Sequence, residues 1–185
     1  MPKKDKYLLA GDIGGTKAKL AIYHPKDGPR HPLAEATLQS ADFASLEALV
    51  AQFLTGKGGS ICRASLGIAG PIVNGRVQVT NLPWLVDERT LRADLGAPVA
   101  ILNDLAAIAL GIPFLEAQDL ATLNKGTPAP NGAIAVIAPG TGAWGGLPDL
   151  EWRCLRSLRL RRRPHRFRTN QPDRIGIAFL LDVSP

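Results

Sequence analysis

Two short stretches of the chain carry residues that could act on a phosphate ester. The first, "GDIGGTK", spans residues 11–17, and a glycine turn of this kind presents consecutive backbone N–H groups that suit phosphate oxygens. Thr16 adds a hydroxyl donor, and Asp12 could hold Mg²⁺ directly or through water. A plain hairpin turn would use the same glycines for positive φ angles, so these letters leave both interpretations open.

The second stretch, "ILNDLAAIALG", places Asn103 and Asp104 where an apolar strand gives way to a helix. In open α/β sheets, ligands bind at the carboxyl ends of the strands. A carboxylate there can take a proton from a substrate hydroxyl. Asn and Asp are also preferred helix N-caps, and the spacing alone favours capping over catalysis.

Two other stretches are weaker candidates for binding. In "TNLPWL", Asn81 could bond a polyhydroxylated ligand above Trp84, or the segment could be an ordinary loop with a buried tryptophan. "APGTG" is a second glycine turn, and with Gly145 it matches the dinucleotide-binding pattern by letter. That pattern requires a helix to follow, whereas Gly146, Leu147 and Pro148 come next, so a dinucleotide site is not expected. The histidines show no metal-ligand spacing.

A framework of strands and helices must position these residues, and the hydrophobic pattern predicts it. The order of elements indicates an α/β fold with a mixed sheet. Alternating apolar residues predict a strand hairpin over 7–13 and 17–23, and Asn74-Gly75 predicts a second hairpin within 71–81. Helical spacing and a capping Asp87 predict helices elsewhere. The further elements expected are helices at 43–54, 87–95 and 105–110, and strands at 64–69, 97–102 and 133–138.

The composition is that of a soluble globular protein whose basic residues gather near the C-terminus. Hydrophobic residues make up 45% and charged residues 21%, which are ordinary values for this class. Residues 143–185 hold nine Arg, no Lys and four acidic residues, whereas residues 1–142 hold thirteen basic and twelve acidic ones. Two cysteines give no disulfide framework, and no signal peptide or membrane span is expected. A cytoplasmic protein without a membrane partner is therefore predicted.

Four segments in order resemble the bacterial glucokinase family, within the sugar kinase, heat-shock-70 and actin superfamily. They are "LAGDIGGTKAKLAIY", "SLGIAGPIVNGRVQVTNLPW", "ILNDLAAIALGIP" and "AIAVIAPGTG", within residues 7–142. The resemblance implies an actin-like ATPase (ribonuclease H-like) small domain over 1–112, with a mixed sheet and flanking helices. It implies the start of a larger lobe over 113–142, and hence an incomplete second lobe.

The resemblance also implies roles for individual residues. The ATP γ-phosphoryl group would pass to the 6-hydroxyl of glucose, giving glucose 6-phosphate and ADP at the first step of glycolysis. Asp104 would be the catalytic base, and Mg²⁺ would lie near Asp12. The family's dimer contacts would fall in the part of the larger lobe that this chain lacks. The sugar would be held by Asn103 and Asp104, and Asn81 is the further candidate from the loop described above. The phosphates would be held by Gly11, Asp12, Ile13, Gly14, Gly15 and Thr16, and by a second loop of Gly140, Thr141 and Gly142.

The segment after residue 142 departs from the family pattern. The family continues there with a Glu-Gly-Gly-His segment that contacts the sugar, whereas this chain has "RCLRSLRLRRRPHRFR". Back-translating 147–171 and reading from the second base of each codon yields Phe-Leu-Thr-Trp-Asn-Gly-Asp-Ala-Tyr-Val-Ala-Tyr-Ala-Ser-Glu-Gly-Gly-His-Thr-Asp-Phe-Ala-Pro-Thr-Asn. We therefore expect a reading-frame change near 142–146, an unstructured Arg-rich segment over 143–185 and impaired activity.

The alternative is a non-catalytic protein that binds sugar, or nucleic acid through the basic segment. Arginines can neutralise nucleic-acid phosphates, but the segment lacks Lys and matches no recognised module, so no specific nucleic-acid partner is expected. A sugar-binding regulator of the repressor–kinase type would need a helix-turn-helix ahead of Tyr7, where only six residues stand.

Overall fold

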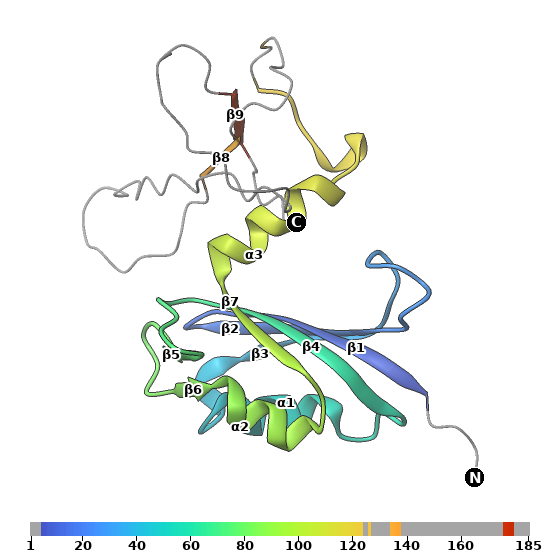
Figure 1. The fold of residues 1–185 in the computed structure, drawn as a ribbon, viewed down its shortest axis with the longest axis vertical. Helices are drawn as coiled ribbons and strands as arrows, with labels where there is room; N and C mark the ends of the chain where they lie inside the picture. The colour runs from blue at the N-terminus through green and yellow to red at the C-terminus, as the bar shows by residue number, and fades with distance from the viewer. Residues whose placement is uncertain (1–4, 124–125, 127–133, 138–175, 180–185) are drawn as a thin grey trace, which may run out of the picture. The chain divides into compact units, whose positions relative to one another are not determined.

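A computed structural model describes residues 5–123, 126, 134–137 and 176–179 of the chain (Figure 1). The chain divides into two units, Met1–Ile108 and Ala109–Pro185, and each is described by itself. The domain boundaries expected from the sequence, after residues 112 and 142, stay predictions.

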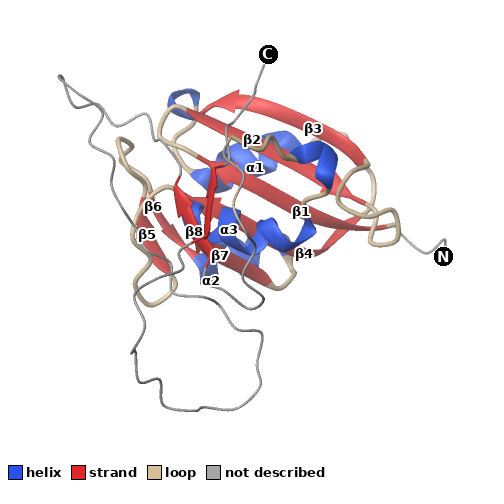
Figure 2. Cartoon of the chain, turned by 90° about the horizontal axis from the view of Figure 1, so that it is seen from above, coloured by secondary structure: helices blue, strands red, loops and turns tan. Residues whose placement is uncertain are grey.

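The first unit is built on a five-stranded sheet in the order β3-β2-β1-β4-β7. In Figure 2, which is turned to look from above, the strands of this sheet lie side by side. The first three strands pair antiparallel, and β4 and β7 continue the sheet parallel to β1. The predicted mixed sheet is confirmed. Its strands are β1 (Lys6–Ile13), β2 (Lys17–Tyr23), β3 (Pro32–Gln39), β4 (Ser60–Ile68) and β7 (Val99–Asn103).

Two helices, α1 (Leu46–Leu54) and α2 (Glu88–Leu95), cover one face of this sheet (Figure 1). The helix expected at 43–54 begins at Leu46 because the Ser45 hydroxyl accepts a hydrogen bond from the Ala48 N–H at 3.2 Å and caps it. An N-cap residue has extended backbone angles, so the chain before it is not helical. The buried face of α1 consists of Leu46, Leu49, Val50 and Phe53.

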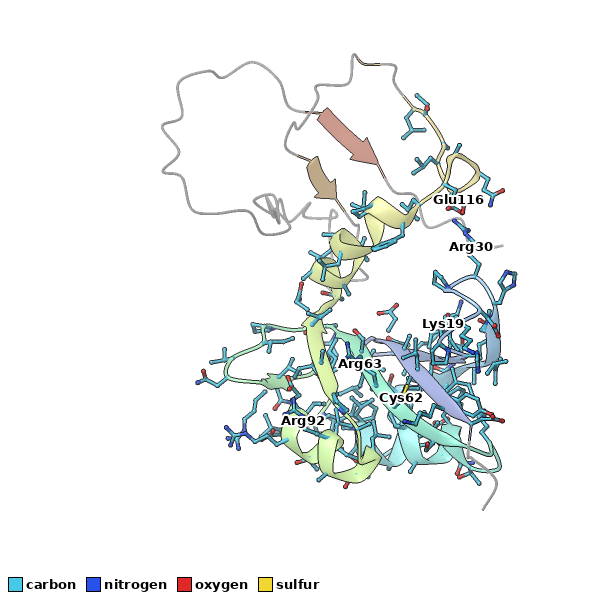
Figure 3. The ribbon with its side chains drawn as sticks, turned by 45° about the vertical axis from the view of Figure 1, so that its right-hand side comes forward. Lys19, Arg30, Cys62, Arg63, Arg92 and Glu116 are labelled. Carbon is cyan, nitrogen blue, oxygen red and sulfur yellow. The ribbon has the colours of Figure 1, made fainter. Side chains whose placement is uncertain are left out.

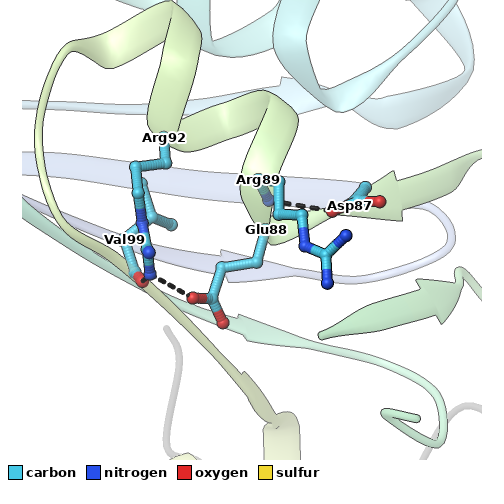
Figure 4. A network of polar contacts seen from close by, with 5 residues as sticks. All are labelled: Asp87, Glu88, Arg89, Arg92 and Val99. Carbon is cyan, nitrogen blue, oxygen red and sulfur yellow. Dashed lines mark hydrogen bonds and ion pairs between the residues drawn. The ribbon is translucent and has the colours of Figure 1, made fainter. Parts of the chain in front are cut away.

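The predicted cap of α2 is confirmed. Asp87 accepts a hydrogen bond from the Arg89 N–H at 2.8 Å, and Gly96, with φ of 59°, ends the helix in the left-handed conformation that glycine favours. Asp87 also accepts a hydrogen bond from the Arg76 Nε at 2.6 Å. Figure 4 shows this cap beside an ion pair of Glu88 with Arg92. The pKa of Asp87 is lowered, chiefly by the bond from the Arg89 backbone and then by the bond from Arg76.

The turn at Asn74-Gly75 forms as predicted, but the hairpin around it does not. Both residues have positive φ angles, 51° and 74°, as a tight two-residue turn requires. Only one isolated bridge, Val73 to Arg76, closes this turn. Pro71 has no N–H to extend the pairing, and β5 (Arg76–Gln78) pairs instead with β6 (Leu85–Asp87).

The core lies between the helices and the facing side of the sheet. It joins alternate residues of the strands to the buried faces of α1 and α2 and to Trp84, which is 2% exposed and donates from Nε1 to Phe43 O at 3.1 Å. A Cβ on Gly11 would come within 2.6 Å of Leu20 Cδ2 and 2.7 Å of Leu66 Cδ2. Gly11 is therefore required for packing of the sheet core, and Trp84 fits the interpretation of a loop with a buried tryptophan.

The second unit contains a parallel pair of short strands, β8 (Ile134–Ile137) and β9 (Gly176–Phe179). β8 agrees with the strand predicted at 133–138. β9 lies in the segment for which no regular structure was expected, and the rest of 143–185 lies outside the described residues. In the described part of the chain, no helix is both long and apolar enough to cross a membrane.

Candidate active site

The site is built on the carboxyl ends of three parallel strands. The register aligns Ile13 of β1 with Ile68 of β4, and Ile68 with Asn103 of β7. The residues that follow these positions therefore share one edge of the sheet, the place where open α/β sheets bind ligands. This edge brings the first glycine loop together with Asn103 and Asp104.

The glycine loop, Gly14–Thr16, connects β1 to β2 and is held from two sides. Gly14 N–H donates to Lys17 O at 2.9 Å, and Ser40 N–H donates to Thr16 O at 2.9 Å. The Ser40 hydroxyl donates to Gly14 O at 2.9 Å. Within the described residues, no protein group accepts from the N–H of Gly15 or of Thr16. Consecutive unpaired N–H groups of this kind suit an anion.

A neighbouring segment, Thr80–Asn81, packs directly against this loop. Ala69 N–H donates to Ile13 O at 3.0 Å, and Thr80 N–H donates to Ala69 O at 3.1 Å. A Cβ on Gly15 would overlap Thr80 O and lie 3.3 Å from Asn81 Cβ. Asn81 has a φ of 62°, a conformation that Asn tolerates better than most residues. The structure thus places the predicted sugar residue Asn81 beside the predicted phosphate loop.

The structure shows which of Asn103 and Asp104 caps the helix that follows, a question that the sequence left open. Asn103 donates from Nδ2 to Gly70 O at 3.1 Å, and its Oδ1 accepts from the Ala106 N–H at 3.4 Å. Asn103 is therefore the residue that caps α3 (Asp104–Gly111). Asp104 is half-buried, and its Oδ1 accepts from the adjacent Leu105 N–H at 2.9 Å. Its carboxylate is not needed as the cap.

Gly67 allows this arrangement, and it was not among the residues selected from the sequence. A Cβ on Gly67 would lie 3.2 Å from Ala107 Cβ and 3.7 Å from the Asp104 Cα. The missing side chain therefore lets the start of α3 approach β4 closely. A glycine inside an otherwise regular strand is the usual signal of such an approach.

Asp12 lies on the exposed side of β1. In the register it is next to Gly67 of β4 and to Lys19 of β2, which Figure 3 labels. In the described part of the chain, no three His, Cys, Asp or Glu side chains gather to hold a metal. Mg²⁺ commonly uses only one or two carboxylates together with substrate phosphates, so Asp12 fits that kind of site. Ile13 is fully buried in the core.

The predicted second phosphate loop, Gly140–Gly142, lies outside the described residues. Of the other predicted residues, the edge of the sheet brings together Gly14, Gly15, Thr16, Asn81, Asn103 and Asp104. Gly11 and Ile13 instead contribute to the packing of the hydrophobic core. Ser40 also belongs to this site. It follows β3, a strand that the sequence did not predict, so nothing pointed to it.

Comparisons with known proteins agree with this architecture. The sequence profile of the family described as "Glucokinase" matches residues 9–146. The glucokinase of Nostoc punctiforme is 42% identical over 138 residues, covering 73% of this chain and 40% of that protein. The glucokinase of Erwinia tasmaniensis is 35% identical, covering 74% and 42%. The chain thus spans about two fifths of the length of the curated relatives it matches.

Solved structures give the same result. The crystal structure of a glucokinase from an Antarctic psychrotroph superposes with a TM-score of 0.62 at 32% identity, covering 74% of this chain and 44% of that one. The inorganic polyphosphate/ATP-glucomannokinase of Arthrobacter sp. strain KM gives a TM-score of 0.51 at 26% identity, covering 74% and 56%. The family match ends at residue 146, at the edge of the interval where a change of reading frame is predicted.

Proposed function

Because this chain belongs to the glucokinase family, we propose that its first unit supplies half of the site of an ATP-dependent glucose kinase. The proposed reaction moves the γ-phosphoryl group of ATP to the 6-hydroxyl of glucose, giving glucose 6-phosphate and ADP. The observation that carries this proposal is the convergence of the Gly14–Thr16 loop and Asp104 on one edge of the sheet.

Asp104 is the proposed general base. A carboxylate at this position accepts the proton of the sugar hydroxyl as that oxygen attacks the phosphorus atom. Support comes from the division of roles at the start of α3: Asn103 provides the cap, and the Asp104 carboxylate bonds only to the adjacent Leu105 N–H among the described residues. That bond fixes one oxygen and so orients the carboxyl group.

The proposed sugar contacts come from Asn81 and Asn103. The Asn103 side chain uses one donor and one acceptor within the protein. A carboxamide has two N–H donors and two lone pairs on its oxygen, so one donor and one lone pair remain for sugar hydroxyls. Asn81 lies beside Gly15, which supports a sugar position next to the phosphate loop.

The N–H groups of Gly15 and Thr16, with the Thr16 hydroxyl, are proposed to donate to phosphate oxygens. The second loop, Gly140–Gly142, is proposed to bind the nucleotide as well. Asp12 is the residue that would hold Mg²⁺, which when bound neutralises charge on the phosphates. In such a reaction the protein contributes mainly positioning and electrostatic stabilisation.

The proposal also specifies the phosphoryl donor and the sugar. The name of the Arthrobacter relative includes both polyphosphate and mannose-type sugars. We propose ATP and glucose for this chain because the curated relatives are named as glucokinases. Rates of sugar phosphorylation decide which donor and which sugar the chain uses, when ATP is compared with polyphosphate and glucose with mannose.

The test is glucose 6-phosphate formation by the wild-type chain and by Asp104→Asn. Asparagine can still accept the Leu105 N–H but cannot take a proton, so the rate is expected to fall about 10²–10⁴-fold without loss of folding. Asp94→Asn, an exposed change on α2, is the matched control and should keep the wild-type rate. An Asp104→Asn chain as fast as its control contradicts the proposed base. A wild-type chain that neither turns over nor binds glucose contradicts the function for this chain.

A further inference from the structure

Ser40 is a buried polar residue to which the chemistry above gives no role. It is fully buried, and it is the one buried polar or charged residue among those the structure describes. It begins the short 3-10 helix η1 (Ser40–Asp42) directly after β3. Its hydroxyl donates to Gly14 O at 2.9 Å, and its N–H donates to Thr16 O at 2.9 Å. Ser40 therefore holds the glycine loop on both sides of Gly15.

The bond to Gly14 O fixes the direction of a neighbouring N–H group. The Gly14 carbonyl and the Gly15 N–H belong to one peptide group, which is planar and trans. In such a group the two bonds point in opposite directions. Because the Ser40 hydroxyl holds the carbonyl, the Gly15 N–H points away from Ser40. We propose that Ser40 is a positioning residue that aims the Gly15 N–H at a phosphate oxygen of the nucleotide, an inference that rests on the proposed function.

The alternative conformation of the loop shows why an anchor is needed. In a closed two-residue hairpin, the Gly14 carbonyl would accept the Lys17 N–H while the Gly14 N–H donates to Lys17 O. Here the second bond forms at 2.9 Å, but the carbonyl bonds to Ser40 instead. Glycine has the backbone freedom to adopt either form. Removing the Ser40 hydroxyl should let the Gly14–Gly15 peptide turn toward the closed hairpin and withdraw the Gly15 N–H.

The anchor is itself held by regular structure. The register pairs Lys17 of β2 with Gln39 of β3, which sets Ser40 opposite Thr16. A rigid neighbouring strand thus supplies the hydroxyl, and its position does not depend on the bound ligand. Support of this kind keeps binding groups within the narrow limits that phosphoryl transfer requires.

The experiment titrates the isotope-labelled full chain with inorganic tripolyphosphate and Mg²⁺, following the Gly15 amide by NMR. The variants are Ser40→Ala and the matched control Ser45→Ala. Ser45 also bonds a backbone group, the Ala48 N–H at 3.2 Å, so its loss destabilises the fold without touching the loop. Ser40→Ala should weaken tripolyphosphate binding about tenfold and slow hydrogen exchange at the Lys17 amide, which gains the Gly14 carbonyl as its acceptor in the closed hairpin. Ser45→Ala should bind like the wild type.

The possible outcomes separate this inference from the proposed function. Equal tripolyphosphate affinity for Ser40→Ala and Ser45→Ala, with a wild-type chain that binds, overturns the role of Ser40 and leaves the phosphate loop in place. A wild-type chain whose Gly15 amide does not respond overturns the phosphate loop, and the positioning role with it. In that case, unchanged hydrogen exchange at the Lys17 amide of Ser40→Ala would further show that Ser40 does not order the loop.

Discussion

At the scale of single residues, Gly15 gives the sharpest test of how the site is packed. A Cβ there would overlap Thr80 O, so Gly15→Ala should force the proposed phosphate loop and the Thr80–Asn81 segment apart. We expect a loss of about 1–3 kcal/mol in the free energy of unfolding, as for other overpacked positions, measured from the urea midpoint. Gly58→Ala is the control, because a Cβ at Gly58 meets nothing within 4 Å.

The two substitutions should move stability in opposite directions. Gly58→Ala restricts the unfolded chain without strain and should stabilise the protein by up to about 1 kcal/mol. Equal midpoints for the two variants would mean that Thr80 and Asn81 do not lie against Gly15. The proposed neighbourhood of sugar and phosphate contacts would then lose its structural basis.

At the scale of secondary-structure elements, the cap of α2 predicts a pH dependence of stability. The pKa of Asp87 is lowered in the folded chain, mainly by the Arg89 N–H and next by Arg76. A lowered pKa means that the ionised carboxylate stabilises the fold above its unfolded pKa, near 3.9. That contribution is lost as the pH falls through the folded value.

Asp87→Asn should therefore destabilise the chain at pH 7, and its difference from the wild type should shrink as the pH falls below about 4. Asparagine is also a good N-cap, so the substitution removes the charge and largely keeps the cap. Urea midpoints across this pH range measure the effect, with Asp94→Asn on the same helix as the control for a general loss of charge. A difference that persists unchanged at low pH would contradict the assignment.

The elements also show what could be predicted from the sequence. The β1–β2 hairpin, α1 and α2 were predictable because each has its own local signal, an alternating run, a helical apolar face or a capping residue. β3 was missed because only Ala34, Ala36 and Leu38 are half-buried on its inner side, a weak pattern for an edge strand. The hairpin expected around Asn74-Gly75 was wrong, because β5 pairs with β6 across a second turn and not across the strong Asn74-Gly75 signal.

The site was predictable only in part, for a related physical reason. Asn103 and Asp104 could be selected because they lie where a strand gives way to a helix. The sequence alone could not show which of the two caps the helix and which could serve in catalysis. Ser40 and Gly67 owe their importance to segments distant in the chain, Gly14 and Ala107. Contacts of that kind follow from strand register, which sequence periodicity alone does not determine.

At the scale of the whole molecule, the first unit contains only part of the proposed site. The proposed phosphate loop, sugar residues and base meet on its sheet edge, whereas the proposed second loop is at 140–142 in the sequence. The chain spans about two fifths of the length of its curated relatives. Holding both reactants in line supplies most of the catalysis in phosphoryl transfer. We therefore expect the chain to bind phosphate more readily than it turns over glucose.

The change of reading frame is the prediction that decides between these two properties. Sequencing the gene across the codons for 130–185 and beyond should reveal one base gained or lost near 142–146, where the family match also ends. Restoring the frame should encode Glu-Gly-Gly-His and raise glucose 6-phosphate formation by orders of magnitude, with Asp104→Asn abolishing the gain. If the frame stands as printed, the arginines of 153–174 are genuine. Salt-dependent binding of nucleic acid, lost when that segment is deleted, would then be the function to measure.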